Sequence, residues 1–146
     1  MSSDLRDLYQ EVVLDHGRKP RNFRPMETPD AQSVGFNPLC GDKLTLFLRY
    51  DNDTVQDASF QGTGCAISMA SASLLTEAVK GKTRHEVEAM LQAFLAMLTG
   101  DGDASKLGKL AVFSGVRDFP VRVKCATLSW RTLEAAFSGD DEVTTE

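Results

Sequence analysis

The architecture of this chain is set by residues 44–61, LTLFLRYDNDTVQDASFQ. Apolar, aromatic and β-branched side chains favour one strand over 44–50 and a second over 54–61. The polar residues 51–53 lie between them and are typical of a turn, so the pattern predicts a β-hairpin. A short strand at 32–36 is expected to precede it. Together these segments predict a small three-stranded antiparallel sheet.

Helical patterns precede and follow this sheet. Apolar residues at helical spacing predict a first helix over 4–16, with Asp4 as its N-cap and Gly17 just after its last turn. Thr83 and Glu86 have the spacing of a capping box, which predicts a helix from there to about 98. Further helices are expected at 66–79, 105–114 and 121–137, with a loop at 100–103. A helix, three strands and then helices predict an α+β fold with the helices packed on the sheet.

The composition indicates one domain that spans 1–146, with an acidic tail at 138–146 that is expected to be disordered. Hydrophobic residues make up 42% of the 146 residues, which is enough for an ordinary core. A net charge of −5 argues against nucleic-acid binding. No stretch approaches the roughly 20 apolar residues of a membrane span, and no secretory signal is visible. The odd number of cysteines disfavours a disulfide framework, so we expect a cytoplasmic protein with reduced thiols.

Three cysteines, Cys40, Cys65 and Cys125, are spread along the chain in different local settings. Asp42 lies two residues after the first of them. Three thiols and a carboxylate are a plausible ligand set for one tetrahedral metal ion. Because the four residues are far apart in sequence, only folding can bring them together.

The local sequence favours a reactive or metal-bound role for two of these cysteines. Cys40 lies in a turn-like loop, in which Gly41 lets the backbone turn between two candidate ligands. Cys65 follows a glycine loop and begins a helix, whose dipole favours the thiolate. The alternative is that all three cysteines are small buried apolar side chains. Cys40 and Cys65 fit that alternative less well, because glycine lies next to each of them.

Three motifs, in this order, resemble the iron–sulfur scaffold superfamily, the IscU-like proteins. YQEVVLDH at 9–16, followed by PRN at 20–22, is similar to its first helix and connector. NPLCGD at 37–42 is similar to its first-cysteine loop, and GTGCAIS at 62–68 to its second. The resemblance covers about residues 5–137. It implies the same α+β fold, with the site at the end of the sheet where the three cysteine loops meet.

Two departures place the chain within that superfamily. The scaffold branch has a histidine just before its third cysteine, and this chain has Lys124 there. The stretch between Cys65 and Cys125 is also longer than in the scaffold branch, with the extra length around 97–118. Both features, together with FPVRVKCATL at 119–128, resemble the SufU branch.

This resemblance implies a cofactor, a partner and a set of site residues. Cys40, Asp42, Cys65 and Cys125 match the metal ligands of the family, and the implied metal is zinc. Arg122 matches its mechanistic arginine, so Cys40 and Arg122 are the expected catalytic residues. SufU-branch proteins are zinc-dependent sulfurtransferases that work with a SufS-type cysteine desulfurase. The implied step is transfer of persulfide sulfur to Cys40, once a desulfurase histidine has replaced this thiolate on zinc.

Two other functions stay open at this point. The chain could be a scaffold on which a transient iron–sulfur cluster is built, although Lys124 and the added segment argue against it. It could also be a structural zinc domain used for binding, in which case loss of Cys40 would unfold it. In the sulfur-transfer reading, the sulfur passes on to a downstream Suf-type cluster scaffold complex. The thiols alone do not distinguish zinc from iron.

Ordinary structural roles are expected for several other polar and aromatic residues. His16 is expected to cap carbonyl groups at the end of the first helix. Trp130 is expected to be a packed aromatic side chain. The basic residues of the connector are either solvated or a docking surface for a partner; they are Arg18, Lys19, Arg21 and Arg24.

Overall fold

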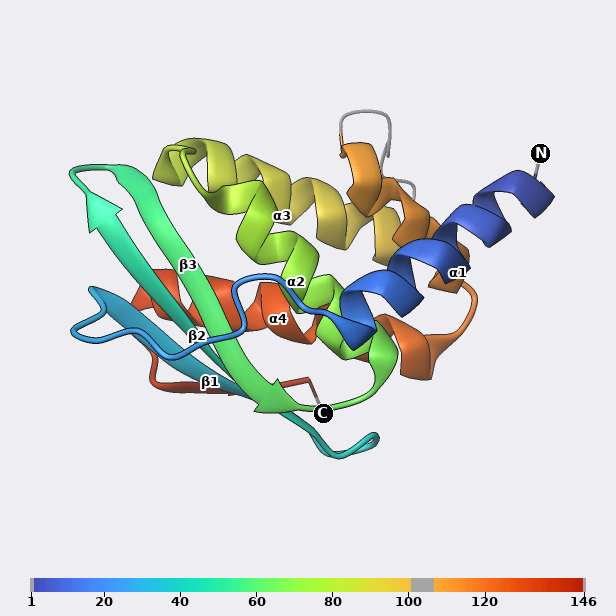
Figure 1. Cartoon of the computed structure of the whole chain (residues 1–146), viewed down its shortest axis with the longest axis horizontal. Helices are drawn as coiled ribbons and strands as arrows, with labels where there is room; N and C mark the ends of the chain where they lie inside the picture. Colours follow the sequence, from blue (N-terminus) through green and yellow to red (C-terminus); the bar gives the residue numbers. More distant parts are fainter. Residues whose placement is uncertain (1, 101–106, 146) are drawn as a thin grey trace.

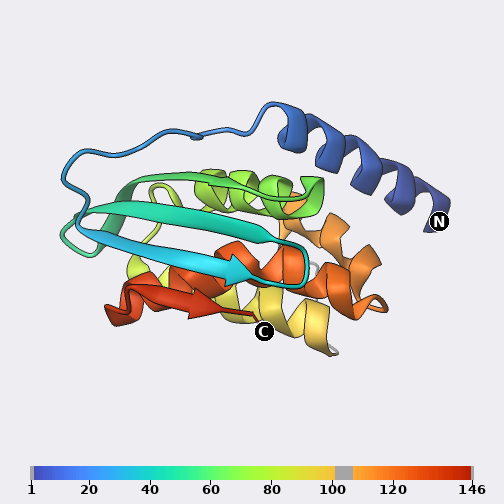
Figure 2. The same ribbon diagram turned by 90° about the horizontal axis from the view of Figure 1, so that it is seen from below.

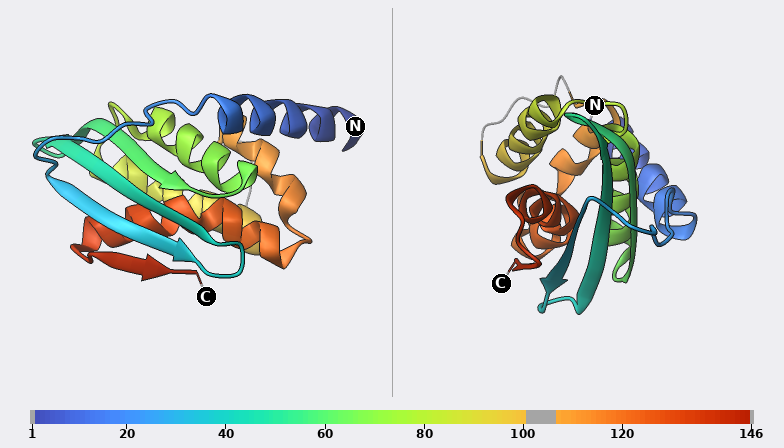
Figure 3. Two further views of the ribbon diagram at one scale, coloured as in Figure 1. Left: turned by 60° about the horizontal axis from the view of Figure 1, so that its bottom comes forward. Right: turned by 90° about the vertical axis from the view of Figure 1, so that its left-hand side faces the viewer.

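The computed structural model describes residues 2–100 and 107–145 (Figure 1). In this part of the chain a four-stranded sheet is formed by β1 (Ala31–Asn37), β2 (Asp42–Asp51), β3 (Thr54–Thr63) and β4 (Glu142–Thr144), in the order β3-β2-β1-β4. Its helices are α1 (Ser2–Arg18), α2 (Ala66–Val79), α3 (Arg84–Thr99), the 3-10 helix η1 (Gly108–Val116) and α4 (Pro120–Ser138). The helices α2 and α4 lie across one face of the sheet (Figures 2 and 3), which confirms the α+β prediction.

The predicted hairpin and the strand before it are both present. β2 and β3 pair antiparallel from Lys43↔Thr63 to Asp51↔Thr54. β1 pairs antiparallel with β2, and Asn37↔Asp42 is the last pair of that ladder. The residues at 38–41 therefore form a short loop that connects the paired residues Asn37 and Asp42.

The fourth strand corrects the prediction of a three-stranded sheet with a disordered tail at 138–146. α4 is followed by Gly139, whose left-handed φ of 79° turns the chain back toward the sheet. The N–H of Val34 donates to the carbonyl oxygen of Asp141 (2.9 Å), and β4 then runs parallel to β1. The tail takes strand structure because of this long-range pairing, which a local sequence pattern does not reveal.

The helix boundaries agree with the sequence at most ends but not in α1. α1 begins at Ser2 and continues to Arg18, so the predictions of Asp4 as N-cap and of Gly17 beyond the last turn are wrong. α2 has the predicted bounds, and α3 begins with the predicted capping box of Thr83 and Glu86. Residues 101–103 of the predicted loop and the start of the predicted helix at 105–114 lie outside the described residues. Among the helices described, none has the length and apolar character needed to cross a membrane.

The core lies between the sheet and the helices. Trp130 of α4 is fully buried and stacks on Phe94 of α3, with 4.5 Å between ring centroids, which confirms its predicted packing. The indole N–H of Trp130 donates to Ser71 Oγ (3.2 Å), a small residue of α2 that lets the two helices approach closely. Alternate side chains of β2 are buried against these helices: Leu44, Leu46 and Leu48.

His16 does not cap α1, contrary to the prediction. Its side chain is 2% exposed, and its Nδ1 lies 2.8 Å from Ser73 Oγ on α2. The same Ser73 oxygen accepts a hydrogen bond from the backbone N–H of Arg21 (2.8 Å). His16 therefore links α1, α2 and the connector that follows α1.

This connector is held against the sheet and α2. Phe23 forms a bridge with Phe60 of β3, and the N–H of Arg24 donates to the carbonyl oxygen of Phe60 (3.0 Å). The guanidinium of Arg24 pairs with Asp57 at 2.8 Å. The connector thus has tertiary contacts along its length and is more than a solvated link.

Candidate metal centre

Three segments that are distant in sequence meet at one end of the sheet. They are the β1–β2 loop at 38–41, the β3–α2 connection at 64–65, and the first turns of α4. Each segment carries one of the three cysteines. The fold therefore brings the three cysteine-bearing segments to the same end of the sheet.

Three of the four predicted ligands form a compact group. One potential ligand atom each from Cys40, Asp42 and Cys125 lies within 4.8 Å of the others. The thiol of Cys125 donates to the sulfur of Cys40 at a distance of 3.2 Å. Cys125 is buried and Cys40 is exposed, so the group extends from the core to the surface.

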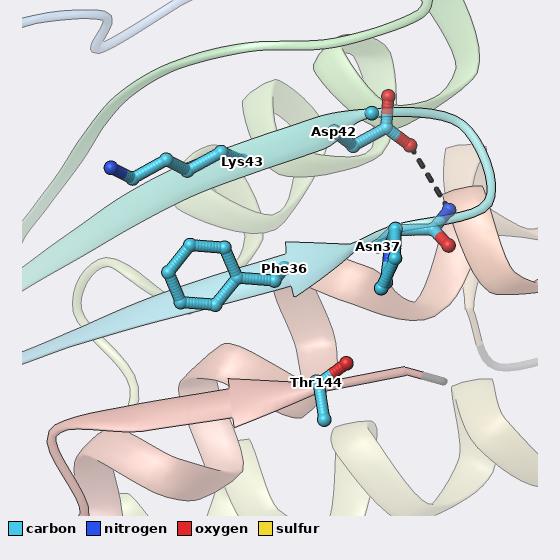
Figure 4. A pocket seen from close by; sticks show the side chains of 7 residues that line it. Phe36, Asn37, Asp42, Lys43 and Thr144 are labelled. Atoms are coloured by element: carbon cyan, nitrogen blue, oxygen red, sulfur yellow. Dashed lines mark hydrogen bonds between the residues drawn. The ribbon is translucent and has the colours of Figure 1, made fainter.

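Asp42 is a buried carboxylate with well-defined partners. It is 2% exposed, and its Oδ1 accepts a hydrogen bond from the backbone N–H of Cys65 (2.9 Å). Its Oδ2 accepts a hydrogen bond from the side-chain amide of Asn37 (3.1 Å) (Figure 4). A Cβ atom on Gly64 would lie 2.7 Å from Oδ1, so the close approach of the two segments requires glycine at 64.

Cys65 borders the compact group without belonging to it. This residue is the N-cap of α2, and its sulfur accepts a hydrogen bond from the N–H of Ser68 at 3.4 Å. Its thiol is close enough to that of Cys125 to affect the pKa of the latter. Cys65 therefore lies beside the group, on the helix terminus that stabilises a thiolate.

The donors of this site suit a cation. Burial, followed by hydrogen bonding with Cys40 and Cys65, raises the pKa of the Cys125 thiol. Asp42 is buried too, and within residues 2–100 and 107–145 it forms no ion pair. A buried carboxylate beside a buried thiol is favourable when a positive charge joins them. Sulfur and carboxylate donors together fit a borderline-soft divalent metal such as zinc or iron(II).

Arg122, the other expected catalytic residue, lies in the first turn of α4, three residues before Cys125. Its exposed guanidinium lies over the ring of Phe119, 4.9 Å from the centroid. The pKa of Tyr9 on α1 is raised, mainly by burial. The charge of Arg122 opposes this shift, and Cys65 and Cys125 add to it. Tyr9 therefore lies within electrostatic reach of Arg122 and of two of the three thiols. In the structure as described, Arg122 has no hydrogen bond to a ligand atom.

Two residues at this end of the sheet were not singled out by the sequence. Tyr9 enters the sequence analysis only as the first residue of the motif at 9–16. Asn37 is fully buried, and its amide also donates to the sulfur of Cys125 at 3.5 Å. The signal was present, because Asn37 is a polar residue that opens the cysteine motif at 37–42.

The family model of the NifU-like N-terminal domain matches residues 8–137, which include all three cysteines and Asp42. The chain belongs to this family. Among its relatives, the zinc-dependent sulfurtransferase SufU of Bacillus subtilis is 40% identical over 142 residues, which are 96% of each chain. The iron–sulfur cluster assembly scaffold protein IscU of Streptococcus pyogenes serotype M1 is 38% identical over 92% of this chain and 85% of its own length.

Solved structures of this NifU-like family have the same fold. A crystal structure from Fervidobacterium islandicum AW-1, a candidate cluster assembly scaffold protein of the SUF system, superposes with a TM-score of 0.84. It is 35% identical and covers 90% of this chain and 97% of its own. The NifU-like protein of Brucella abortus, at 24% identity and a TM-score of 0.82, supports the fold alone. These matches confirm the resemblance to IscU-like proteins and to their SufU branch.

Proposed function

We propose that this protein is a zinc-dependent sulfur-transfer protein of iron–sulfur cluster assembly. Its Cys40 accepts persulfide sulfur from a SufS-type cysteine desulfurase and passes it to a downstream Suf-type scaffold complex. The observation that carries this proposal is an exposed thiol, Cys40, placed 3.2 Å from the buried thiol of Cys125. The similarity to a zinc-dependent sulfurtransferase over nearly the whole chain supports it.

Zinc would be held by Cys40, Asp42, Cys65 and Cys125. When bound, it would keep the sulfur donors as thiolates at neutral pH, including the buried one. Asp42 is already oriented for this role by its two hydrogen bonds, from Cys65 N–H and the Asn37 amide. The ligand set is proposed from the geometry of the compact group and from the position of Cys65 beside it.

The transfer itself needs a nucleophile and a leaving thiolate. The thiolate of Cys40 attacks the outer sulfur of the desulfurase persulfide, and a new S–S bond forms at Cys40. The S–S bond of the desulfurase breaks, and its cysteine leaves as a thiolate. Sulfur moves without net oxidation or reduction, so no further redox partner is required.

Cys40 is the thiol best placed for this attack. It lies in the loop at 38–41, beside Leu39, which is 62% exposed. A Cβ atom on Gly41 would meet nothing within 4 Å, so this part of the loop faces open space. Cys125 is buried, and Cys65 is fixed at the start of α2. Arg122 lies in the first turn of α4, the helix that carries Cys125, and its positive charge would offset the negative charge of the ligand set.

The experiment that tests this function measures intact mass. The zinc-loaded protein is incubated with the cysteine desulfurase of its own genome and cysteine, without added reductant. We expect a mass gain of one or more sulfur atoms that is lost in Cys40→Ala. A folded protein that gains no sulfur beside an active desulfurase would exclude the relay.

Cluster scaffolding on the same residues is the second candidate, and the similarity to IscU proteins favours it. The two functions differ in what they require. A scaffold would acquire iron and sulfide together and develop the visible absorption of an iron–sulfur cluster. A sulfur-transfer protein gains sulfur without iron. The presence of Lys124, where the scaffold branch has histidine, supports the latter.

A further inference from the structure

We propose that Asn37 is a positioning residue that fixes Asp42 and Cys125 as the stationary half of the metal site and leaves Cys40 as the mobile half. This inference rests on the proposed metal-binding function. It concerns a residue that is neither a ligand nor a nucleophile.

The first observation is the double donation from one amide group. The Asn37 Nδ2 atom lies 3.1 Å from Asp42 Oδ2 and 3.5 Å from Cys125 Sγ. An amide NH₂ group carries two hydrogens, so it can donate to both ligands at once. Donors from outside the ligand set orient metal ligands and tune their donor strength. Figure 4 shows the Asn37 side chain turned toward the carboxylate of Asp42.

The second observation is the burial of Asn37. Its side chain is fully buried, and its Oδ1 has no hydrogen-bond partner among the described residues. A buried polar oxygen without a partner is unfavourable. An apolar side chain of similar size would avoid this, so the two donated hydrogen bonds are the structural advantage of asparagine here.

The third observation is the backbone around Asn37. This residue pairs with Asp42 at the end of the β1–β2 ladder, and its carbonyl oxygen accepts a hydrogen bond from the N–H of Cys40 at 3.3 Å. Asn37 therefore holds the base of the loop at 38–41. The part of the loop around Gly41 extends into open space. In the described part of the chain, the side chain of Asn37 donates to Asp42 and Cys125 but not to the sulfur of Cys40.

Together these contacts make the three thiols unequal. A sulfur that accepts a hydrogen bond shares its electron density with the donor and is a weaker nucleophile. Cys125 accepts from Asn37, and Cys65 accepts from the N–H of Ser68. In the described part of the chain, the thiol of Cys125 is the only hydrogen-bond donor to the sulfur of Cys40, and metal binding would remove its proton. The hydrogen-bond pattern thus directs reaction to Cys40.

The test compares Asn37→Leu with a matched control on the same strand. Leucine is close to asparagine in size and has no donor. Ser33→Ala is the control, because Ser33 is fully buried on β1 and its Oγ has no partner among the described residues. For each protein we would measure thermal unfolding without metal, zinc affinity by chelator competition and the visible spectrum of the cobalt(II) form. Iodoacetamide labelling of the zinc-loaded protein, mapped by peptide mass, would show which cysteine reacts.

We expect Asn37→Leu to fold and to bind zinc roughly 10- to 100-fold more weakly, the range for loss of a partner behind the ligands. Its cobalt spectrum should change, and labelling should spread from Cys40 to Cys125. Ser33→Ala should match the unsubstituted protein in zinc affinity, spectrum and labelling. An Asn37→Leu protein with unchanged affinity, spectrum and labelling overturns the inference. A change in thermal unfolding alone also overturns it, because it indicates a purely structural role. If the unsubstituted protein binds neither zinc nor cobalt, the proposed function itself fails.

Discussion

The sulfur atoms of Cys40 and Cys125 lie 3.2 Å apart, although 85 positions separate the two residues in sequence. This contact joins an exposed loop to the buried side of α4. The two thiols therefore differ in what their removal does to the fold. Burial makes Cys125 part of the core, whereas Cys40 contributes little to it.

Replacement of Cys40 by alanine is expected to leave the metal-free protein as stable as before. An exposed side chain away from the core typically changes the free energy of unfolding by no more than about 0.5 kcal/mol. Denaturant unfolding of the metal-free protein measures this. A zinc-loaded protein that unfolds on losing Cys40 would favour a structural metal domain over sulfur transfer.

Replacement of Arg122 by alanine is expected to slow sulfur acceptance while zinc stays bound. The guanidinium lies over the ring of Phe119 and acts electrostatically on Tyr9, which also senses Cys65 and Cys125, and it is not a ligand. The rate of mass gain with desulfurase and the zinc content of the same sample provide the measurement. Arg131→Ala is the control, because Arg131 is on the same helix and pairs with Glu134 at 3.3 Å. Equal rates for both variants would show that Arg122 is an ordinary surface arginine.

Replacement of Gly64 by alanine is expected to disturb the site directly. The new Cβ would lie 2.7 Å from Asp42 Oδ1, so the carboxylate must move. We expect a loss of about 1–3 kcal/mol in unfolding free energy, as for other overpacked sites, and weaker zinc binding. Gly115→Ala makes the same chemical change where a Cβ meets nothing within 4 Å. Similar zinc affinities for the two variants would contradict a close approach at Gly64.

Protonation of His16 is expected to destabilise the fold below neutral pH. Burial, followed by the charge of Arg21, lowers the pKa of His16. The unfolded state therefore binds more protons than the folded state, and stability rises with pH. The contribution is complete above about pH 6.5, the usual pKa of histidine, and is lost as the pH falls below it.

Denaturant unfolding of the metal-free protein across this pH range measures the effect. His16→Asn should reduce the dependence of the unfolding free energy on pH. The other histidine of the chain, His85, is exposed, and His85→Asn should leave the dependence unchanged. A similar reduction in both variants would mean that the buried environment of His16 is not its origin.

Local patterns predicted the elements that local interactions stabilise. The hairpin follows from alternating side chains and a polar turn, and the start of α3 follows from the reciprocal bonds of Thr83 and Glu86. β4 was missed because its partner, β1, lies more than a hundred residues earlier. His16 was misread for the same reason, because its partner Ser73 is 57 positions away.

Part of the candidate site could likewise be predicted from the sequence, and part of it could not. Cys40, Asp42 and Cys125 could be chosen from residue type and motif, and the structure brings them within 4.8 Å of one another. The role of Asn37 could not be predicted in this way. It depends on the distances from its amide nitrogen to Asp42 Oδ2 and to Cys125 Sγ, which only the folded chain defines. Residue types indicate which atoms can bind a metal, whereas the surrounding hydrogen bonds emerge only from tertiary structure.

The pairing of β4 with β1 also bears on how this protein meets other chains. Unpaired outer strands invite strand addition and aggregation. Here one edge strand is β4, which has only three residues, and the other edge strand, β3, is partly covered by the connector through Phe23, Arg24 and Phe60. A foreign strand would find only a short edge at β4 and would have to displace the connector at β3. Strand addition at either margin of the sheet is therefore disfavoured.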